Sequence, residues 1–224
     1  MAEMVNQGES VADIGTDHAY VPMLLMRDGI SPKAIMSDIS EGSLAKAKET
    51  FSICDIEVSD IDFRIGDGLD TIKAGEVDAI IIGGLGGHTI VDILDADTDK
   101  ARSFKKYILQ PRKHSGALRH YLYTHGFDIT DELLSREGKF ECEIIVAKPS
   151  SELQREEMYP AGDIRWKYPK KMVDANPKNA KTRIEWKINS IEEQIKNLNS
   201  SSTDKSEMIT ELKSELEYLK SVIT

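Results

Sequence analysis

The sequence has few cysteines and no long apolar run, and both absences narrow what the protein can be. Its only cysteines are Cys54 and Cys142, whose separation fits neither a disulfide framework nor a thiolate metal site. No apolar stretch approaches the roughly 20 residues that a membrane-spanning helix needs. The first ten residues carry two acids and no base, unlike a secretory signal. We therefore expect a cytoplasmic protein with no membrane partner.

Aromatic residues are also scarce, at 6%, whereas hydrophobic residues make up 40% and charged residues 30% of the 224 positions. This composition predicts a globular protein with one well-filled domain and a smaller second module. The formal net charge of −10 disfavours a polyanionic partner, unless cations are concentrated in one segment. His114, His120 and His125 lack metal-ligand spacing, so we expect no metal.

Residues 1–149 alternate between strand-like and helix-like patterns, which predicts an α/β fold with a Rossmann-like parallel sheet. Strands are expected at 10–15, 33–38, 61–66, 77–83 and 106–110. Helices are expected at 19–28, 41–52, 87–95 and 115–125. Segments 127–134 and 139–148, joined by the turn SREGK, should form an antiparallel hairpin at the edge of the sheet.

The last 75 residues follow a different pattern. Residues 150–180 contain three prolines and little periodicity, which predicts a basic, irregular linker. Residues 181–224 then carry two apolar seams at heptad-like spacing, separated by the polar stretch NSSSTDKS: Ile184, Ile188, Ile191, Ile195 and Leu198 in the first, and Ile209, Leu212, Leu216, Leu219 and Ile223 in the second. We favour an intramolecular helical hairpin. A partner-binding helix or an intermolecular coiled coil stays open, and we expect a monomer or weak dimer.

Acidic residues and glycines follow the first three predicted strands. Asp13 and Gly15 end the first strand, Asp38 ends the second, and Asp67 and Gly68 follow the third. Carboxyl ends of parallel strands share one edge of a sheet, where open α/β folds bind ligands. Each residue alone could serve a turn or a helix cap, but together they favour a nucleoside-type cofactor.

The fourth strand runs into the glycine-rich segment 83–87, GGLGG, which includes Gly83 and Gly84. Several glycines beside a central strand could form a surface without side chains, on which a flat base approaches the cofactor. A flexible loop is the alternative interpretation.

The motifs ADIGTDHAYVP, GDGL, GGLGG, ILQP, LRHYL and EGKFECEIIVA occur in the order seen in the bacterial tRNA (adenine-22-N1)-methyltransferase family, called TrmK, which the chain therefore resembles. The resemblance implies a class I methyltransferase fold, S-adenosylmethionine as methyl donor, and methylation of adenine N1 in the D-loop region of tRNA. It puts Asp13, Gly15 and Asp17 around the methionyl portion, Asp38 at the ribose, and Asp67 and Gly68 at the adenine. It also matches Gly83 to Gly87 to a glycine-rich segment of the family, and we expect Gly83 and Gly84 to contact the cofactor. One departure is Arg112, which stands where the family has asparagine after Leu-Gln-Pro.

Methylation of a ring nitrogen with a free lone pair needs mainly positioning of the two reactants. Asp17 and His18 are our candidates to accept a proton from the methylated adenine or to bind its N6, and we prefer Asp17. His18 could equally be a residue at the start of a helix that bonds to the backbone. Tyr20 could stack on a base, but we expect it to lie in the core.

A basic segment offers contacts for RNA despite the overall negative charge. Residues 161–187 hold eight basic and three acidic residues, a balance of +5, and Trp166 and Tyr168 are interleaved with the first cations. The expected RNA contacts are Arg112, Lys113, Arg165, Lys167, Lys170 and Lys171. Two other functions stay open: a methyltransferase for a small molecule or a protein, and a binding protein for RNA or a nucleoside without turnover.

Overall fold

The computed structural model describes residues 1–54, 61–137, 140–150, 159–199 and 205–223. Its centre is a seven-stranded sheet with the order β3-β2-β1-β4-β5-β7-β6. The strands are β1 (Val11–Ile14), β2 (Ala34–Asp38), β3 (Ile61–Ile65), β4 (Ala79–Gly83), β5 (Lys106–Gln110), β6 (Phe127–Glu137) and β7 (Phe140–Pro149). The first five run parallel, and β7 is antiparallel to both of its neighbours. This is the predicted class I methyltransferase architecture.

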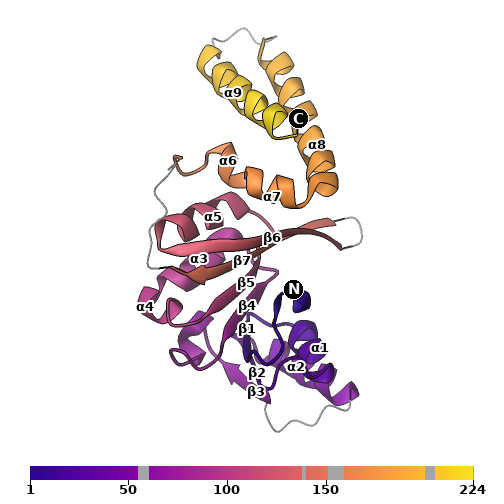
Figure 1. Cartoon of the computed structure of the whole chain (residues 1–224), viewed down its shortest axis with the longest axis vertical. Helices are drawn as coiled ribbons and strands as arrows, with labels where there is room; N and C mark the ends of the chain where they lie inside the picture. Colours follow the sequence, from indigo (N-terminus) through magenta and orange to yellow (C-terminus); the bar gives the residue numbers. More distant parts are fainter. Residues whose placement is uncertain (55–60, 138–139, 151–158, 200–204, 224) are drawn as a thin grey trace.

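Helices cover both faces of the sheet because its central strands are apolar on both sides (Figure 1). In β4, Ile80 and Ile82 belong to one core, which also contains residues of α3 (Gly87–Asp95), α4 (Thr98–Ala101) and α5 (Ser115–Thr124). Ala79 and Ile81 belong to the opposite core, with residues of α1 (Tyr20–Arg27) and α2 (Glu41–Ile53).

The predicted strands and helices of residues 1–149 are confirmed to within a few residues at each end. Three short helices were not predicted: the 3-10 helices η1 (Ala2–Met4) and η2 (Gly68–Thr71), and α4. Segments of three or four residues are too short for an apolar period to reveal them. Within the predicted turn SREGK, residues 138 and 139 lie outside the described residues.

The C-terminal part contains α6 (Ile164–Lys167), α7 (Lys170–Ala175), α8 (Pro177–Asn199) and α9 (Ser206–Val222). Figure 1 shows α8 and α9 side by side as a hairpin beyond the sheet. Ile184, Ile188, Ile191 and Leu219 are buried in one cluster between them, so the predicted seam packs within the chain. Residues 200–204 of the predicted polar loop lie outside the described residues.

The structure differs from the expected irregular linker at 150–180, because α6, α7 and the start of α8 lie there. Trp166, Tyr168, Met172 and Val173 are buried, so this segment is packed structure. Because the rings of Trp166 and Tyr168 are buried, the two aromatic residues among the first cations are not available to stack on RNA bases. Prolines divide the segment into helices too short to show an apolar period.

The helical part docks on β6, the outer strand of the sheet. Asn176 accepts a hydrogen bond from Leu134 N (3.0 Å) and donates one to Glu132 O (2.9 Å). Asn179 donates to Leu134 O (3.1 Å), and Lys171 Nζ donates to Ile129 O (2.7 Å). These side chains form hydrogen bonds with backbone N–H and C=O groups of an edge strand. Without them, those groups would be free to pair with a strand of another chain. No described helix is long and apolar enough to cross a membrane.

Candidate active site

A cavity of about 610 Å³ opens at the carboxyl ends of β1, β2 and β3. The lining comes from the ends of these strands and the residues that follow them, including η2, and from Leu85, α3 and the two residues after α3: Ile14, Gly15, Asp38, Ile39, Ser40, Gly66, Asp67, Gly68, Leu69, Asp70, Leu85, Thr89, Asp92, Ile93, Ala96 and Asp97. Its volume lies in the range of pockets that hold small-molecule cofactors. Four of the predicted cofactor residues, Gly15, Asp38, Asp67 and Gly68, therefore share one cavity.

Two glycines allow the cavity walls to approach each other. Gly15 and Gly68 have φ values of +73° and +47°, a left-handed conformation that residues with a Cβ rarely adopt. A Cβ on Gly15 would lie 3.3 Å from Leu85 Cδ1, and one on Gly68 would lie 3.3 Å from Ile93 Cγ2. Larger residues would strain both turns and crowd the apolar walls.

Asp38 and Asp67 present acceptors at neighbouring strand ends. Asp38 Oδ1 accepts a hydrogen bond from Ser40 N (2.7 Å), which orients the carboxylate at the start of α2. Asp67 is exposed and precedes η2 without capping it through its side chain. Between them Ile39 is 73% exposed although it is apolar, so a flat ligand in the cavity could cover it. Two acceptors and an apolar surface suit a nucleoside.

Asp13 lies directly before the lining residues Ile14 and Gly15 and lacks a counter-ion. Burial raises the pKa of its carboxyl group to about 6; the Thr16 hydroxyl acts in the opposite direction, and the nearby Asp38 carboxylate adds to the rise. Nowhere in the described chain does a cation form an ion pair with Asp13. Thr16 Oγ1 is also buried; it lies close enough to Asp13 to act on that carboxyl group but forms no well-aligned hydrogen bond with any residue that the structure describes. Buried polar groups without partners are costly, so this corner suits a cationic, hydrogen-bonding ligand group.

Asp17 and His18 do not line the cavity in the described structure. The Asp17 carboxylate is exposed and accepts a hydrogen bond from Lys46 Nζ (2.7 Å), which lowers the pKa of Asp17. The His18 ring stacks on Tyr20 at 5.2 Å between ring centroids. Tyr20 itself is 58% exposed, so its expected core position is wrong.

Residues 83–87, which we call the glycine loop, are held by backbone hydrogen bonds rather than left flexible. Gly84 N donates to Gln110 O (3.1 Å) and to Gln110 Oε1 (2.9 Å). Arg112 N donates to Leu85 O (2.8 Å), and Gly87 N donates to Lys113 O (2.7 Å). Within the described residues, Leu85 of this loop lines the cofactor-sized cavity, whereas Gly83 and Gly84 do not.

A second cavity, of about 370 Å³, includes Arg112 and Lys113, the residues to which the glycine loop is hydrogen-bonded. Its lining is Pro111, Arg112, Lys113, His114, Ser115, Glu143, Lys167 and Arg183. We call it the basic cavity. It brings together three of the predicted RNA contacts, Arg112, Lys113 and Lys167, and adds Arg183, which sequence reasoning counted in the basic segment but did not single out.

The other three predicted RNA contacts lie elsewhere and are engaged within the protein. Arg165 pairs with Asp163 at 2.6 Å, and Lys170 pairs with Asp174 at 2.7 Å. Lys171 donates to the backbone of β6, as described above. The sequence shows where positive charge is concentrated but not which cations already have a partner.

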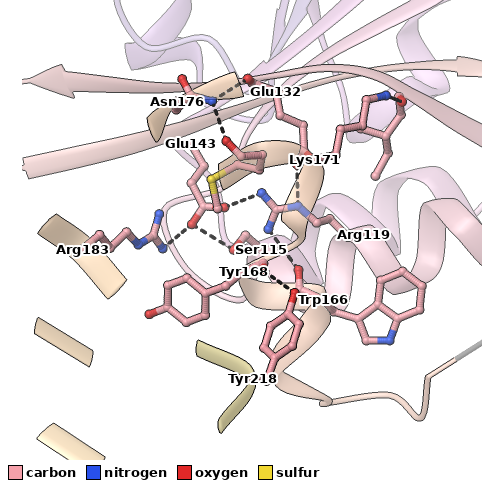
Figure 2. Close-up of polar contacts among 12 residues, drawn as sticks. Ser115, Arg119, Glu132, Glu143, Trp166, Tyr168, Lys171, Asn176, Arg183 and Tyr218 are labelled. Carbon is pink, nitrogen blue, oxygen red and sulfur yellow. Dashed lines mark hydrogen bonds and ion pairs between the residues drawn. The ribbon is translucent and has the colours of Figure 1, made fainter. Parts of the chain in front are cut away.

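A buried charged cluster that shares Ser115, Glu143 and Arg183 with the lining of the basic cavity was not predicted from the sequence (Figure 2). The Arg119 side chain is 1% exposed and bridges Glu132 and Glu143, with N–O distances of 2.6 Å to each. Glu143 also accepts hydrogen bonds from Ser115 Oγ (3.1 Å) and from Arg183. Arg119 Nη1 donates to Trp166 O (3.1 Å), so the cluster joins α5, β6 and β7 to α6 and α8. The charged residues of this cluster are far apart in the sequence, on separate helices and strands. No local sequence pattern therefore predicts that they form ion pairs.

Comparisons with known proteins agree with this geometry. Residues 1–145 match the family model described as "Methyltransferase domain". The tRNA (adenine(22)-N(1))-methyltransferase of Bacillus subtilis (strain 168) is 38% identical over 148 residues, which are 66% of this chain and 62% of that protein. The chain thus spans less than two thirds of this curated relative in the alignment.

Two solved structures extend the likeness to the C-terminal helices. The B. subtilis M1A22 tRNA methyltransferase TrmK is 30% identical, with a TM-score of 0.77, and the match covers 100% of this chain and 95% of that one. The Streptococcus pneumoniae protein Sp1610, solved in complex with S-adenosyl-L-methionine, is 25% identical, with a TM-score of 0.80 and coverage of 100% and 96%.

Proposed function

The chain belongs to the methyltransferase-domain family and, within it, to the TrmK proteins, and from this premise we propose that it transfers a methyl group from S-adenosylmethionine to N1 of an adenine in tRNA. The acceptor would be adenine 22 in the D-loop region, as the name of the B. subtilis relative states for that protein. The observation that carries the proposal is the convergence of Gly15, Asp38 and Asp67 on one cofactor-sized cavity.

Each acid at the strand ends has a distinct proposed task. Asp38 would accept hydrogen bonds from the ribose hydroxyls, and Asp67 would accept one from the adenine amino group. Asp13 and Thr16 would bind the ammonium group of the methionyl portion, which supplies the positive charge that Asp13 lacks. The cofactor would supply an electrophilic methyl group at its sulfonium. The acceptors at the strand ends, Asp38 and Asp67, and the uncompensated carboxylate of Asp13 therefore match the polar groups of S-adenosylmethionine.

The chemistry that remains for the protein is mainly positioning. Adenine N1 has a free lone pair, and holding two reactants in line can contribute roughly 7–11 kcal/mol. N1 lies on the Watson–Crick edge, so the target adenine must leave its stack before it reacts. The glycine loop, fixed by Gln110 and Lys113, would give the base a rigid surface, since Gly83 and Gly84 present no side chain to it.

Asp17 and His18 remain proposed groups near the acceptor, with Asp17 in a changed role. Its ion pair with Lys46 favours the charged carboxylate, so Asp17 is a weak proton acceptor. A permanent negative charge would instead stabilise the positive charge of the methylated ring or accept a hydrogen bond from N6. His18, stacked on the exposed Tyr20, is the better candidate to take a proton.

We propose that the two parts of the chain have different roles toward the RNA. Residues 1–149 would carry the transfer, and the helices from 160 onward would hold the tRNA together with Arg112 and Lys113. Lys167 would contribute most among the cations of the second part, and Arg165, Lys170 and Lys171 less, because they already have partners. The protein would act in the cytoplasm as a monomer or weak dimer.

The test is incubation of the protein with labelled S-adenosylmethionine and three acceptors: unmodified tRNA, free adenosine and a mixture of proteins. We expect label in the tRNA alone. Label in adenosine or protein but not in tRNA would support a different methyltransferase, and RNA binding without transfer would support a non-catalytic protein. Either result would contradict the proposal.

A further inference from the structure

The basic cavity lies where the two parts of the chain meet. Its lining comes from the segment between β5 and α5, the start of α5, and β7 in the first part, and from α6 and α8 in the second. Arg112 and Lys113 belong to the first part, and Lys167 and Arg183 belong to the second. The cavity therefore exists only when the C-terminal helices are docked on the sheet.

The positive charge in this cavity is not neutralised by the protein. Arg112, Lys113, Lys167 and Arg183 face a single acid, Glu143. Glu143 is already held by Arg119, Arg183 and Ser115. In the part of the chain that the structure describes, Arg112, Lys113 and Lys167 form no ion pair.

Two details of the side chains favour an anion as the ligand of this cavity. Burial lowers the pKa of Lys167, and the nearby cations Lys187 and Arg183 lower it further; the carboxylates of Glu143 and Glu215 offset this only in part. Arg183 Nη1 is buried and has no hydrogen-bond partner among the described residues. Lysine and arginine in such surroundings bind phosphate groups through charge-assisted hydrogen bonds.

The glycine loop connects the basic cavity to the cofactor cavity. A Cβ on Gly84 would lie 3.6 Å from Arg112 Nε, and one on Gly86 would lie 3.8 Å from Lys113 Cε. Leu85, between these two glycines, lines the cofactor cavity. An anion held by Arg112 and Lys113 would therefore be separated from the cofactor by the thickness of this loop.

We propose that the basic cavity binds one backbone phosphate of the RNA strand that carries the target adenine, next to the nucleotide that enters the site. The inference rests on the proposed function for the identity of the strand. Because residues from both parts of the chain contact the same phosphate, binding would align the base with the glycine loop only when the C-terminal helices are docked. The cavity thus links recognition by the helices to the position of the acceptor.

The experiment compares Lys167→Gln and Arg112→Gln with the control Lys213→Gln, an exposed lysine of α9 with no partner in the described structure. Binding of unmodified tRNA is measured over a range of salt concentrations. We expect each cavity variant to lose about tenfold in affinity and the slope of log K against log[salt] to fall by roughly one. Lys213→Gln should change neither, and affinity for S-adenosylhomocysteine should stay the same in all three.

Single methylphosphonate linkages in a D-arm RNA then locate the contact. In the wild type, the neutral linkage should weaken binding at one or two positions beside the target adenine, and in Lys167→Gln the same linkage should have no further effect. Equal effects of a linkage in both proteins would overturn the inference. Inorganic phosphate at millimolar concentration should compete with RNA for the wild type more than for Lys167→Gln; equal competition would also count against the cavity.

These results separate the inference from the proposed function. If the wild type methylates tRNA while the cavity variants bind and react normally, the phosphate site is wrong and the proposed function stands. If the wild type transfers no methyl group, the proposed function fails, whereas the methylphosphonate comparison still tests the phosphate contact.

Discussion

Asp13 shows, at the scale of a single residue, how a binding site can lower stability. Burial raises the pKa of its carboxyl group from 3.8 to about 6, so the folded protein holds this proton more tightly than the unfolded chain does. The stability that the group contributes is then fully present below about pH 4 and is lost as the pH rises through 6. At neutral pH the charged carboxylate is therefore a destabilising group.

We predict that Asp13→Asn stabilises the protein at pH 7.5 by up to roughly 3 kcal/mol, at 1.36 kcal/mol for each tenfold change in proton affinity. The gain should shrink toward zero as the pH falls to 4. Urea unfolding at several pH values measures this difference. A variant that is less stable than the wild type at pH 7.5 would show that Asp13 has a counter-charge in the folded protein.

The same residue predicts a pH dependence of cofactor binding. A cationic ammonium group binds only the ionised form of Asp13, so the affinity of the wild type for S-adenosylmethionine should decline below about pH 6, approaching tenfold for each unit. Asp13→Asn should bind more weakly at pH 7.5 and show a flat profile between pH 5 and 7.5. Calorimetric titration gives both profiles, and identical slopes for the two proteins would remove Asp13 from the site.

Asp67 offers a prediction about the adenine end. Asp67→Asn replaces the carboxylate at the cavity wall by a neutral amide and should weaken S-adenosylhomocysteine binding about tenfold, because a charge-assisted hydrogen bond becomes at best a neutral one. Asp99→Asn is the matched control, since Asp99 is an exposed acid of α4 outside the cavity lining. Equal affinities of the two variants would contradict the assignment.

For single residues, the sequence predicted the positions of those that lie at the ends of strands. Gly15, Asp38, Asp67 and Gly68 end a strand or follow one within three residues, so the order of a parallel sheet brings them to one cavity. Asp17 and His18 lie one turn further on, where the chain bends through Ala19 with a φ of +53°. The direction of a side chain after such a bend depends on tertiary contacts, here with Lys46 of α2, and could not be predicted.

At the scale of an element, the glycine loop and the start of α3 are packed against the residues after β5. A Cβ on Gly87 would lie 2.3 Å from the carbonyl oxygen of His114, and backbone atoms cannot move aside as flexible side chains do. This contact sets the distance between α3 and the segment that carries Arg112 and Lys113. Glycine at position 87 is thus explained by packing.

We predict that Gly87→Ala lowers the free energy of unfolding by roughly 1–3 kcal/mol, as overpacking of a close contact does. It should also impair methyl transfer, because the loop must shift. Gly42→Ala is the control, since a Cβ there would meet only Ser40 Oγ at an ordinary 3.5 Å in a helix. That variant should be neutral or slightly more stable. Thermal unfolding of both proteins tests the contrast, and a stable, fully active Gly87→Ala protein would contradict it.

The sequence predicted the long helices and the strands, but it did not predict the short helices. The strands, the long helices and the seam of α8 and α9 have enough residues to show a period, and these were confirmed. The short helices α6 and α7 are held by burial of Trp166, Tyr168 and Met172 against other parts of the chain. Such long-range packing leaves no periodic pattern, so the segment was interpreted as a linker.

At the scale of the whole molecule, a buried charged cluster joins the sheet to the C-terminal helices. Burial opposes the charge of Arg119, but the carboxylates of Glu143 and Glu132 more than offset this and raise its pKa, so the group remains charged. Removal of one member leaves buried charges without a partner, which costs more than the cluster itself contributes.

We predict that Arg119→Met destabilises the protein by about 3–5 kcal/mol and loosens the C-terminal helices. Arg27→Met is the control, because Arg27 pairs with Asp28 on the surface, where such pairs contribute about 0–1 kcal/mol. Chemical denaturation gives both free energies. A loss below 1 kcal/mol for Arg119→Met would mean that the cluster does not hold the two parts together.

The central claim, that strand ends and glycine loop together present an adenine N1 to a sulfonium methyl group, is tested most directly by the identity of the product. Unmodified tRNA and the same tRNA with guanine in place of adenine 22 are each incubated with the protein and S-adenosylmethionine. The RNA is then digested and its nucleosides identified by mass spectrometry. The account predicts 1-methyladenosine from the first tRNA and no methylated nucleoside from the second. Another methylated nucleoside, or equal methylation of both RNAs, would contradict it.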